Sequence, residues 1–220
     1  MRLATLLLFV LPFACTGTPQ PDPPNIELPR VTTPLPPRGI GEIRLLGGPG
    51  AISPPGAGLW AVDLDGDAPP VTLPSAADGS FDGNVVGADG DAFRLQVVAG
   101  DARSEPVDVV LAVGSPIVPL AHALGGCLRA PLELEVSTTA PASVAITNAC
   151  GADVVLGAVR VRTSPSPFSV VTSPTSIAAG ETAEISVELT AEPATDEVLR
   201  IEIVSPAADL LATTLIGGSP

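Results

Sequence analysis

Prolines and glycines divide this chain into short segments. There are 26 prolines and 22 glycines among 220 residues. Both residue types favour turns, since proline fixes one backbone angle and glycine accepts conformations that other residues avoid. Hydrophobic residues still make up 45% of the chain, and many of them are β-branched. This combination predicts short strands separated by frequent turns.

Apolar and polar residues alternate in short runs between residues 39 and 113. Phe93, Leu95 and Val97 point to one face of a predicted strand, and Arg94 and Gln96 point to the other. The predicted strands are 41–46, 59–64, 71–73, 80–86, 92–98 and 107–113. Short strands at this spacing predict an antiparallel β-sandwich over residues 39–113.

Three motifs in this first region resemble bacterial Ig-like modules that occur in tandem on surface proteins. They are the turn Ala77-Asp78-Gly79-Ser80-Phe81, the Gly90-Asp91 pair before a strand, and Ser104-Glu105-Pro106-Val107 before the last strand. The resemblance implies an Ig-like sandwich in a structural or adhesive setting. It brings no catalytic residues with it.

The alternation returns after a connector at residues 114–131, which is rich in proline, glycine and small residues. Leu132, Leu134 and Val136 alternate with glutamates, and similar runs near residues 159–162, 185–189 and 199–203 predict a second sandwich over 132–218. The order of motifs in 128–218 resembles the ASH and HYDIN-type Ig-like domains, a family associated with protein interaction and scaffolding. The expected fold class is all-β, with two Ig-like antiparallel β-sandwich domains in tandem after a signal segment and a proline-rich linker.

The N-terminus predicts export. Met1-Arg2 precedes an apolar run that ends near Leu11, and Ala14-Cys15 follows, so residues 1–14 are interpreted as a signal peptide. The position of Cys15 resembles the lipobox of bacterial lipoproteins, which implies acylation of its thiol. Ordinary cleavage nearby, which would discard this cysteine, is the alternative. Residues 15–38 then hold the anchor and a proline-rich linker that we expect to act as a semi-rigid spacer.

The two later cysteines, Cys127 and Cys150, are expected to form a disulfide, because exported chains enter an oxidising compartment. If residues 132–136 and 143–148 pair as a hairpin with its turn near 138–141, both cysteines lie at its open end. A disulfide there would close the hairpin.

The charge of the chain restricts its partners. Ten arginines, no lysines and 24 acidic residues give a formal net charge of −14. Nucleic acids and anionic lipid surfaces are recognised largely through lysine and arginine, so binding to a nucleic acid is not expected.

The acids Asp63, Asp65 and Asp67 are weak candidates for a calcium site, because calcium prefers clustered carboxylate and carbonyl oxygens. The spacing departs from an EF-hand loop, since Pro74 occupies the twelfth position from Asp63. The alternative is that these acids lie at solvated hairpin tips. No cofactor is expected.

No catalytic motif is recognisable. The chain has one histidine, His122, which is interpreted as a surface residue of the connector. The sequence therefore predicts a non-catalytic, membrane-tethered lipoprotein, most simply of the outer membrane, that binds an unknown protein partner in the envelope or on the surface. A secreted protein, a calcium-dependent binder or adhesin, and a hydrolase that uses two carboxylates brought together by folding are the alternatives.

Overall fold

A computed structural model describes residues 22–35, 41–191 and 195–218 of the chain. Apart from one short 3-10 helix, η1 (Leu28–Arg30), every regular element in these residues is a β-strand. The all-β sandwich fold expected from the alternation is confirmed. No helix in the described ranges is long and apolar enough to cross a membrane. The signal segment and Cys15 lie outside the described residues.

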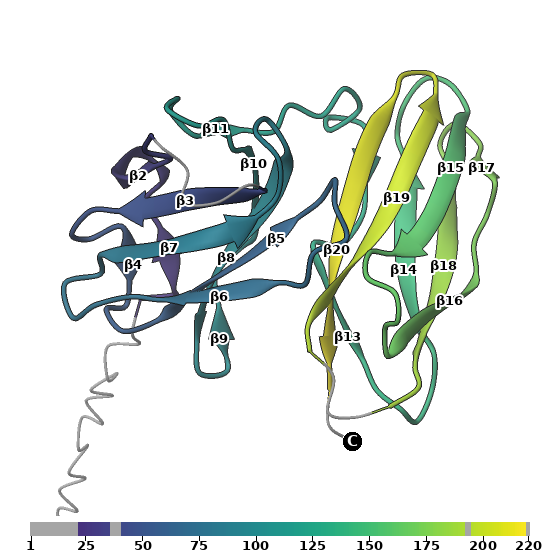
Figure 1. Ribbon diagram of the computed structural model, residues 1–220. Coiled ribbons are helices and arrows are strands. Elements are labelled where there is room, and N and C mark those ends of the chain that lie inside the picture. The colour runs from purple at the N-terminus through teal and green to yellow at the C-terminus, as the bar shows by residue number, and fades with distance from the viewer. Residues whose placement is uncertain (1–21, 36–40, 192–194, 219–220) are drawn as a thin grey trace, which may run out of the picture.

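The described residues between 25 and 119 form the N-terminal sandwich (Figure 1). Its strands are β1 (Asn25–Ile26), β2 (Val31–Thr32), β3 (Glu42–Gly47), β4 (Ile52–Ser53), β5 (Gly58–Asp63), β6 (Val71–Pro74), β7 (Phe81–Val86), β8 (Ala92–Ala99), β9 (Ala102–Arg103), β10 (Val107–Val110) and β11 (Val118–Pro119). A six-stranded sheet has the order β11-β10-β8-β5-β6, with β9 paired to β8, and a three-stranded sheet has the order β2-β3-β7. Strands β1 and β4 form a separate pair.

The described residues between 128 and 217 form the C-terminal sandwich. Its strands are β12 (Leu128–Arg129), β13 (Glu133–Val136), β14 (Ala142–Asn148), β15 (Val154–Val161), β16 (Phe168–Thr172), β17 (Ser176–Ile177), β18 (Thr182–Leu189), β19 (Glu197–Ser205) and β20 (Asp209–Gly217). One sheet has the order β12-β14-β18-β16, and the other has the order β13-β20-β19-β15-β17. All pairs in both sheets are antiparallel except β13 with β20, which is parallel.

The two sandwiches pack face to face through their larger sheets (Figure 1), and we call this contact the joint. Along β5, Leu59 and Ala61 point into the N-terminal core, whereas Trp60 and Val62 point into the joint. Along β20, Leu211 points into the C-terminal core and Ala212 into the joint. The central sheets are therefore covered on both faces where they meet, and the molecule has four layers of sheet.

Part of the expected spacer belongs to the N-terminal sandwich. Strand β1 pairs with β4, and β2 pairs with β3. Ile26 and Val31 are buried in the core, and the Thr33 hydroxyl donates to the carbonyl of Ala112 at 2.6 Å. The prediction of a spacer through residue 38 was therefore wrong for residues 25–33, because strands of two residues are too short to give a periodic signal.

The expected connector also contributes to the sheets. Strand β11 adds to β10, and β12 adds to β14. The predicted hairpin between residues 132–136 and 143–148 does not form, because β13 pairs with β20 in the opposite sheet. The chain thus crosses from one sheet to the other between β12 and β13, at Pro131, which has no backbone N–H to donate.

The disulfide between Cys127 and Cys150 forms in spite of this, with the two Cα atoms 4.8 Å apart. Leu128 lies opposite Asn148 in the β12–β14 pair, and the N–H of Ala149 donates to the carbonyl of Cys127 at 2.8 Å. The cysteines are therefore brought together by β12 and β14. The pairing was predicted correctly, but from the wrong hairpin.

Candidate functional site

Buried charge in this protein is concentrated at the joint. A functional site is often marked by buried ionisable groups, so these residues are the first candidates. Among the described residues, the charged side chains that are buried are Asp63, Arg94, Arg162, Glu197 and Arg200. Each of these residues either contacts the opposite sandwich itself or lies in a loop or strand that contacts it.

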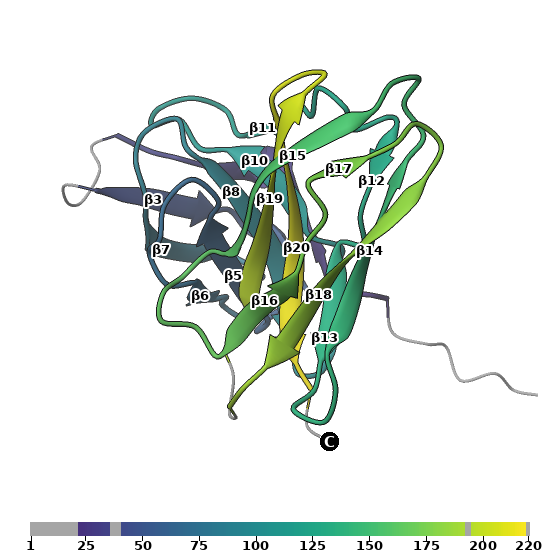
Figure 2. The same ribbon diagram turned by 90° about the vertical axis from the view of Figure 1, so that its right-hand side faces the viewer.

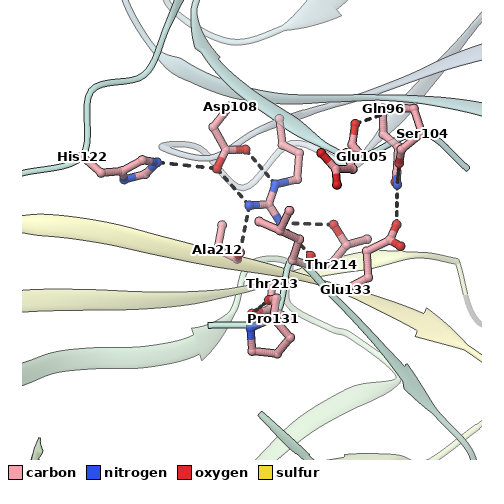
Figure 3. A network of polar contacts seen from close by, with 12 residues as sticks. Gln96, Ser104, Glu105, Asp108, His122, Pro131, Glu133, Ala212, Thr213 and Thr214 are labelled. Carbon is pink, nitrogen blue, oxygen red and sulfur yellow. Dashed lines mark hydrogen bonds and ion pairs between the residues drawn. The ribbon is translucent and has the colours of Figure 1, made fainter. Parts of the chain in front are cut away.

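Arg94 lies at the centre of the joint. Its strand, β8, turns this side chain away from the N-terminal core, and only 1% of the residue is exposed. The guanidinium binds the carboxylate of Asp108 on the neighbouring strand through two hydrogen bonds of 2.7 and 2.9 Å (Figure 3). It also donates to the carbonyls of Leu132 and Ala212, at 3.2 and 2.8 Å, and to the Thr214 hydroxyl at 3.2 Å. These five bonds use the full donor capacity of an arginine, so no donor is left for a ligand.

Gln96 extends this polar contact along β8. Its amide nitrogen donates to the carbonyl of Ser104 and to the carboxylate of Glu133 in the C-terminal sandwich (Figure 3). Nearby, Arg103 forms an ion pair of 2.5 Å with Asp196. Two further charged or polar side chains of the N-terminal sandwich are thus paired with acids of the other sandwich.

A second buried ion pair lies farther along the joint. Arg162 Nε is 3.3 Å from a carboxylate oxygen of Glu197, and Arg162 Nη1 donates to the carbonyl of Gly66 at 3.1 Å. Burial raises the pKa of the Glu197 carboxyl, although its bonds with Val198 and Arg162 lower it. Burial also lowers the pKa of the Arg162 guanidinium. Desolvation is the largest influence on both groups, as expected for charges held between two packed sheets.

The loop that carries Asp63, Asp65 and Asp67 belongs to the joint. An oxygen of Asp63 accepts the backbone N–H of Asp65 at 2.8 Å, and burial raises the pKa of this carboxyl. The side chain of Asp65 accepts the N–H of Ala92 at 2.8 Å, and its carbonyl accepts from Arg200 at 3.2 Å.

The three carboxylates therefore face backbone donors and arginines. Asp67 lies 3.8 Å from Arg160 of the C-terminal sandwich, and Arg200 lies 4.0 Å from Asp65. In the part of the chain that the structure describes, no group of three or more histidines, cysteines and acids could hold a metal ion. The loop binds the C-terminal sandwich, a role that the sequence analysis did not consider.

His122 is held between the two sandwiches and is only partly exposed. Its Nδ1 is 3.2 Å from Asp209 of β20, and its Nε2 is 3.9 Å from Asp108 of β10. The expectation of a surface histidine in a plain connector was therefore incomplete.

A cavity of about 290 Å³ lies beside His122 and Arg94. Its lining also includes Asp108, Leu132 and Ala212, but no serine, threonine or cysteine. An imidazole next to carboxylates would need such a nucleophile to resemble a catalytic triad. The geometry instead suits a structural role, in which His122 joins the connector to acids of both sandwiches.

Sequence reasoning missed Arg94, Gln96, Arg162 and Glu197 as functional residues. A signal was present in β5 and β20, where apolar residues stand on both faces of the strand. Strands with two apolar faces are buried on both sides. A polar residue on a neighbouring strand that points away from the core, such as Arg94 in β8, is then a candidate for a buried ion pair or hydrogen bond.

Comparisons with known proteins identify no family. No family model and no curated protein matches the sequence. A protein of unknown function from Porphyromonas gingivalis W83 is 13% identical, covering 89% of this chain and 100% of that chain, with a TM-score of 0.31. The VesB protease of Vibrio cholerae is 13% identical, with coverages of 73% and 61% and a TM-score of 0.33. Titin domains Z1Z2, solved in complex with telethonin, are 12% identical, with coverages of 91% and 99% and a TM-score of 0.29. Similarity at these TM-scores supports no assignment of activity.

Proposed function

We propose that this chain is a non-catalytic protein-interaction module of the bacterial cell envelope, built from two Ig-like sandwich domains and tethered to the outer membrane through Cys15. The observation that carries the proposal is that the buried charged residues lie at the joint and bind other groups of the protein. Every buried charged side chain in the described ranges lies at the joint, and Arg94 has all of its donors occupied by protein acceptors. Arg94, the buried charge beside the cavity, therefore has no donor left for a substrate.

The joint also suits a module that holds a fixed shape. Apolar residues from both sandwiches, including Trp60, Val62, Val198 and Ala212, form one buried cluster there. If the sandwiches separated, Arg94 would lose its three bonds to Leu132, Ala212 and Thr214, and the ion pair of Arg103 with Asp196 would break. A rigid double sandwich on a proline-rich arm would hold its edges and loops at a set distance from the membrane.

Export is supported by the disulfide and by the N-terminal sequence. Disulfides persist in oxidising compartments, and the apolar run before Ala14-Cys15 has the layout of a secretory signal. Such a location fits a formal net charge of −14, which favours solubility and steers partners by charge.

Fractionation of native cells tests the tether. The unaltered chain should sediment with outer membranes, and a Cys15→Ala variant should not. A Cys127→Ser/Cys150→Ser double variant is the matched control, since it loses two cysteines but keeps the proposed anchor. Equal sedimentation of the unaltered chain and Cys15→Ala would contradict a lipid anchor.

Covalent capture tests the interaction. Chemical cross-linking in intact cells should join the unaltered chain to a defined envelope protein, and the cross-link should weaken when the chain is released by Cys15→Ala. A broad hydrolase screen should show no turnover. Turnover that is abolished by substitution of an aspartate would instead support the carboxylate hydrolase.

A further inference from the structure

One edge of the C-terminal sandwich is open. Strand β15 pairs with β19, with register shifts between Val155 and Val159, but on its other side β17 pairs only with Val154 and Val155. The N–H of Leu156 donates to Thr175, and beyond that residue no strand in the described ranges pairs with this side of β15. Residues 159–161, which pair regularly with β19, therefore form a free sheet edge.

The backbone groups of this edge can be assigned from the ladder. Arg162 donates its N–H to the carbonyl of Val198 in β19, at 2.9 Å. Because successive residues of a strand direct their backbone groups to opposite sides, Val161 and Val159 direct theirs away from β19. Each offers one N–H and one carbonyl to an added strand.

A groove of about 550 Å³ runs beside this edge. The loop after β15 and strand β16 form its other wall, and Figure 2 shows them on the side of the C-terminal sandwich that faces the viewer. Val159, Val161, Phe168 and Val170 pack against the C-terminal core and also line the groove. Hydroxyl side chains from the loop and β16, and the charged residues Asp67, Arg160 and Arg162, line it as well, so the groove has apolar, polar and charged walls.

Three other edge strands carry residues that oppose strand addition. Strand β6 ends at Pro74 after the pair Pro69-Pro70, β11 contains Pro119, and β13 carries Glu133 and Glu135. Prolines and charges are the usual means by which proteins prevent edge pairing. A register shift before Val159 limits the regular edge to residues 159–161, which include no proline and no acid and have Arg160 as their one charged residue.

We infer that this edge binds an extended segment of a partner protein as an additional β-strand. The segment has apolar residues at alternate positions and an acidic residue opposite Arg160. Its apolar side chains lie on the same face as Val159 and Val161, toward the groove, and its backbone pairs with these two valines. This inference rests on the proposed interaction function and names the surface that performs it.

The positive charge of Arg160 is the reason for placing an acidic residue opposite it in the added strand. The Arg160 side chain is 48% exposed, and its contact with Asp67 is long, at 3.8 Å. Exposed ion pairs of this kind contribute little, so a carboxylate directly across the new strand pair can compete for the guanidinium. A second copy of this chain is a poorer occupant, because each copy has a formal net charge of −14.

Designed peptides test the inference on the full mature chain. The probe is a fluorescein-labelled peptide, TVTVEVTV, whose binding is followed by fluorescence anisotropy. The expected result is binding about fivefold tighter than that of TVTVKVTV, with slower hydrogen exchange at the amides of Val159 and Val161. A peptide methylated on the backbone nitrogens of its valines should not bind, because these nitrogens face β15. Equal binding of the methylated peptide would overturn strand addition.

Variants test the role of charge. Arg160→Glu should reverse the preference between the two peptides, and Arg129→Glu, on the exposed surface of β12, should leave it unchanged. An unchanged preference in Arg160→Glu would overturn the assignment of the acidic residue. A dimer that the peptide dissociates, seen by analytical ultracentrifugation, would replace the partner by a second copy and overturn the proposed occupant.

Failure here can be separated from failure of the proposed function. If cross-linking in cells yields an envelope partner but neither peptide binds, the edge is not the interaction surface and the module function stands. If no partner is captured and the chain is not tethered, the proposed function fails whatever the peptides do.

Discussion

Substitution of Asp108 by alanine should destabilise the protein by about 3–5 kcal/mol, because it leaves the buried Arg94 guanidinium without its carboxylate. Arg94 is 1% exposed, and two of its five hydrogen bonds go to Asp108. Its remaining acceptors, such as the carbonyl of Ala212, are neutral and do not compensate the charge.

A second arginine–aspartate pair provides the control. Arg44 binds Asp82 with the same two-bond geometry, at 2.7 and 2.6 Å, but the two side chains are 29% and 39% exposed. Asp82→Ala should therefore cost about 1 kcal/mol or less, since water solvates the charge that is left. The double variant Arg94→Met/Asp108→Leu should recover most of the loss, because it removes both charges and keeps the volume.

Urea unfolding measures these differences. Trp60, the chain's one tryptophan, lies in the apolar cluster of the joint, so its fluorescence reports on separation of the sandwiches. With a slope of about 2 kcal/mol per molar urea, Asp108→Ala should lower the midpoint by about 1.5–2.5 M. A loss equal to that of Asp82→Ala would refute the reasoning that burial makes this pair essential.

Three further predictions follow from buried groups. Burial raises the folded-state pKa of Glu197, so its contribution to the free energy of unfolding is present at low pH and is lost as pH rises from about 4 through the raised pKa. Urea unfolding at several pH values should therefore show a shallower decline of this free energy with rising pH for Glu197→Gln than for the unaltered chain. Reducing the disulfide between Cys127 and Cys150, which are 23 residues apart, should lower the free energy of unfolding by about 3 kcal/mol, measured with and without reductant; no change would contradict its closing role. Asn148→Ala should lower the free energy of unfolding by about 2–3 kcal/mol in the same measurement. The buried amide of Asn148 accepts from the N–H of Cys150 and donates to three carbonyls, those of Ala152, Ile177 and Ala178. A loss below about 1 kcal/mol would mean that water replaces this side chain.

Alternation predicted most strands well, because one face of each is buried and the other is polar. The expected strands at 59–64 and 92–98 correspond to β5 and β8, for example. Strand β20, in contrast, was not recognised. Its sequence, Asp209 to Gly217, is nearly continuous in apolar and small residues, because one face packs on the C-terminal core and the other on the joint.

Pairing and partners were harder to predict than the strands themselves. The pattern of residues 132–136 identifies a strand but not the strand that pairs with it. The hairpin with residues 143–148 was predicted from proximity in sequence alone, and it was wrong. The acids Asp63, Asp65 and Asp67 were interpreted as loop-tip residues or metal ligands. The arginine partners of Asp67 and Asp65 come from β15 and β19, 93 and 135 residues later, and no local pattern indicates such a contact.

The intact mass of the mature protein from its native cell tests the central claim most directly. We expect the mass of a chain that begins at Cys15 and carries added acyl chains, and this mass should increase by two hydrogens when the disulfide is reduced. An unmodified mass that begins after Cys15 would contradict the membrane tether, and the envelope module would have to be replaced by a freely secreted protein.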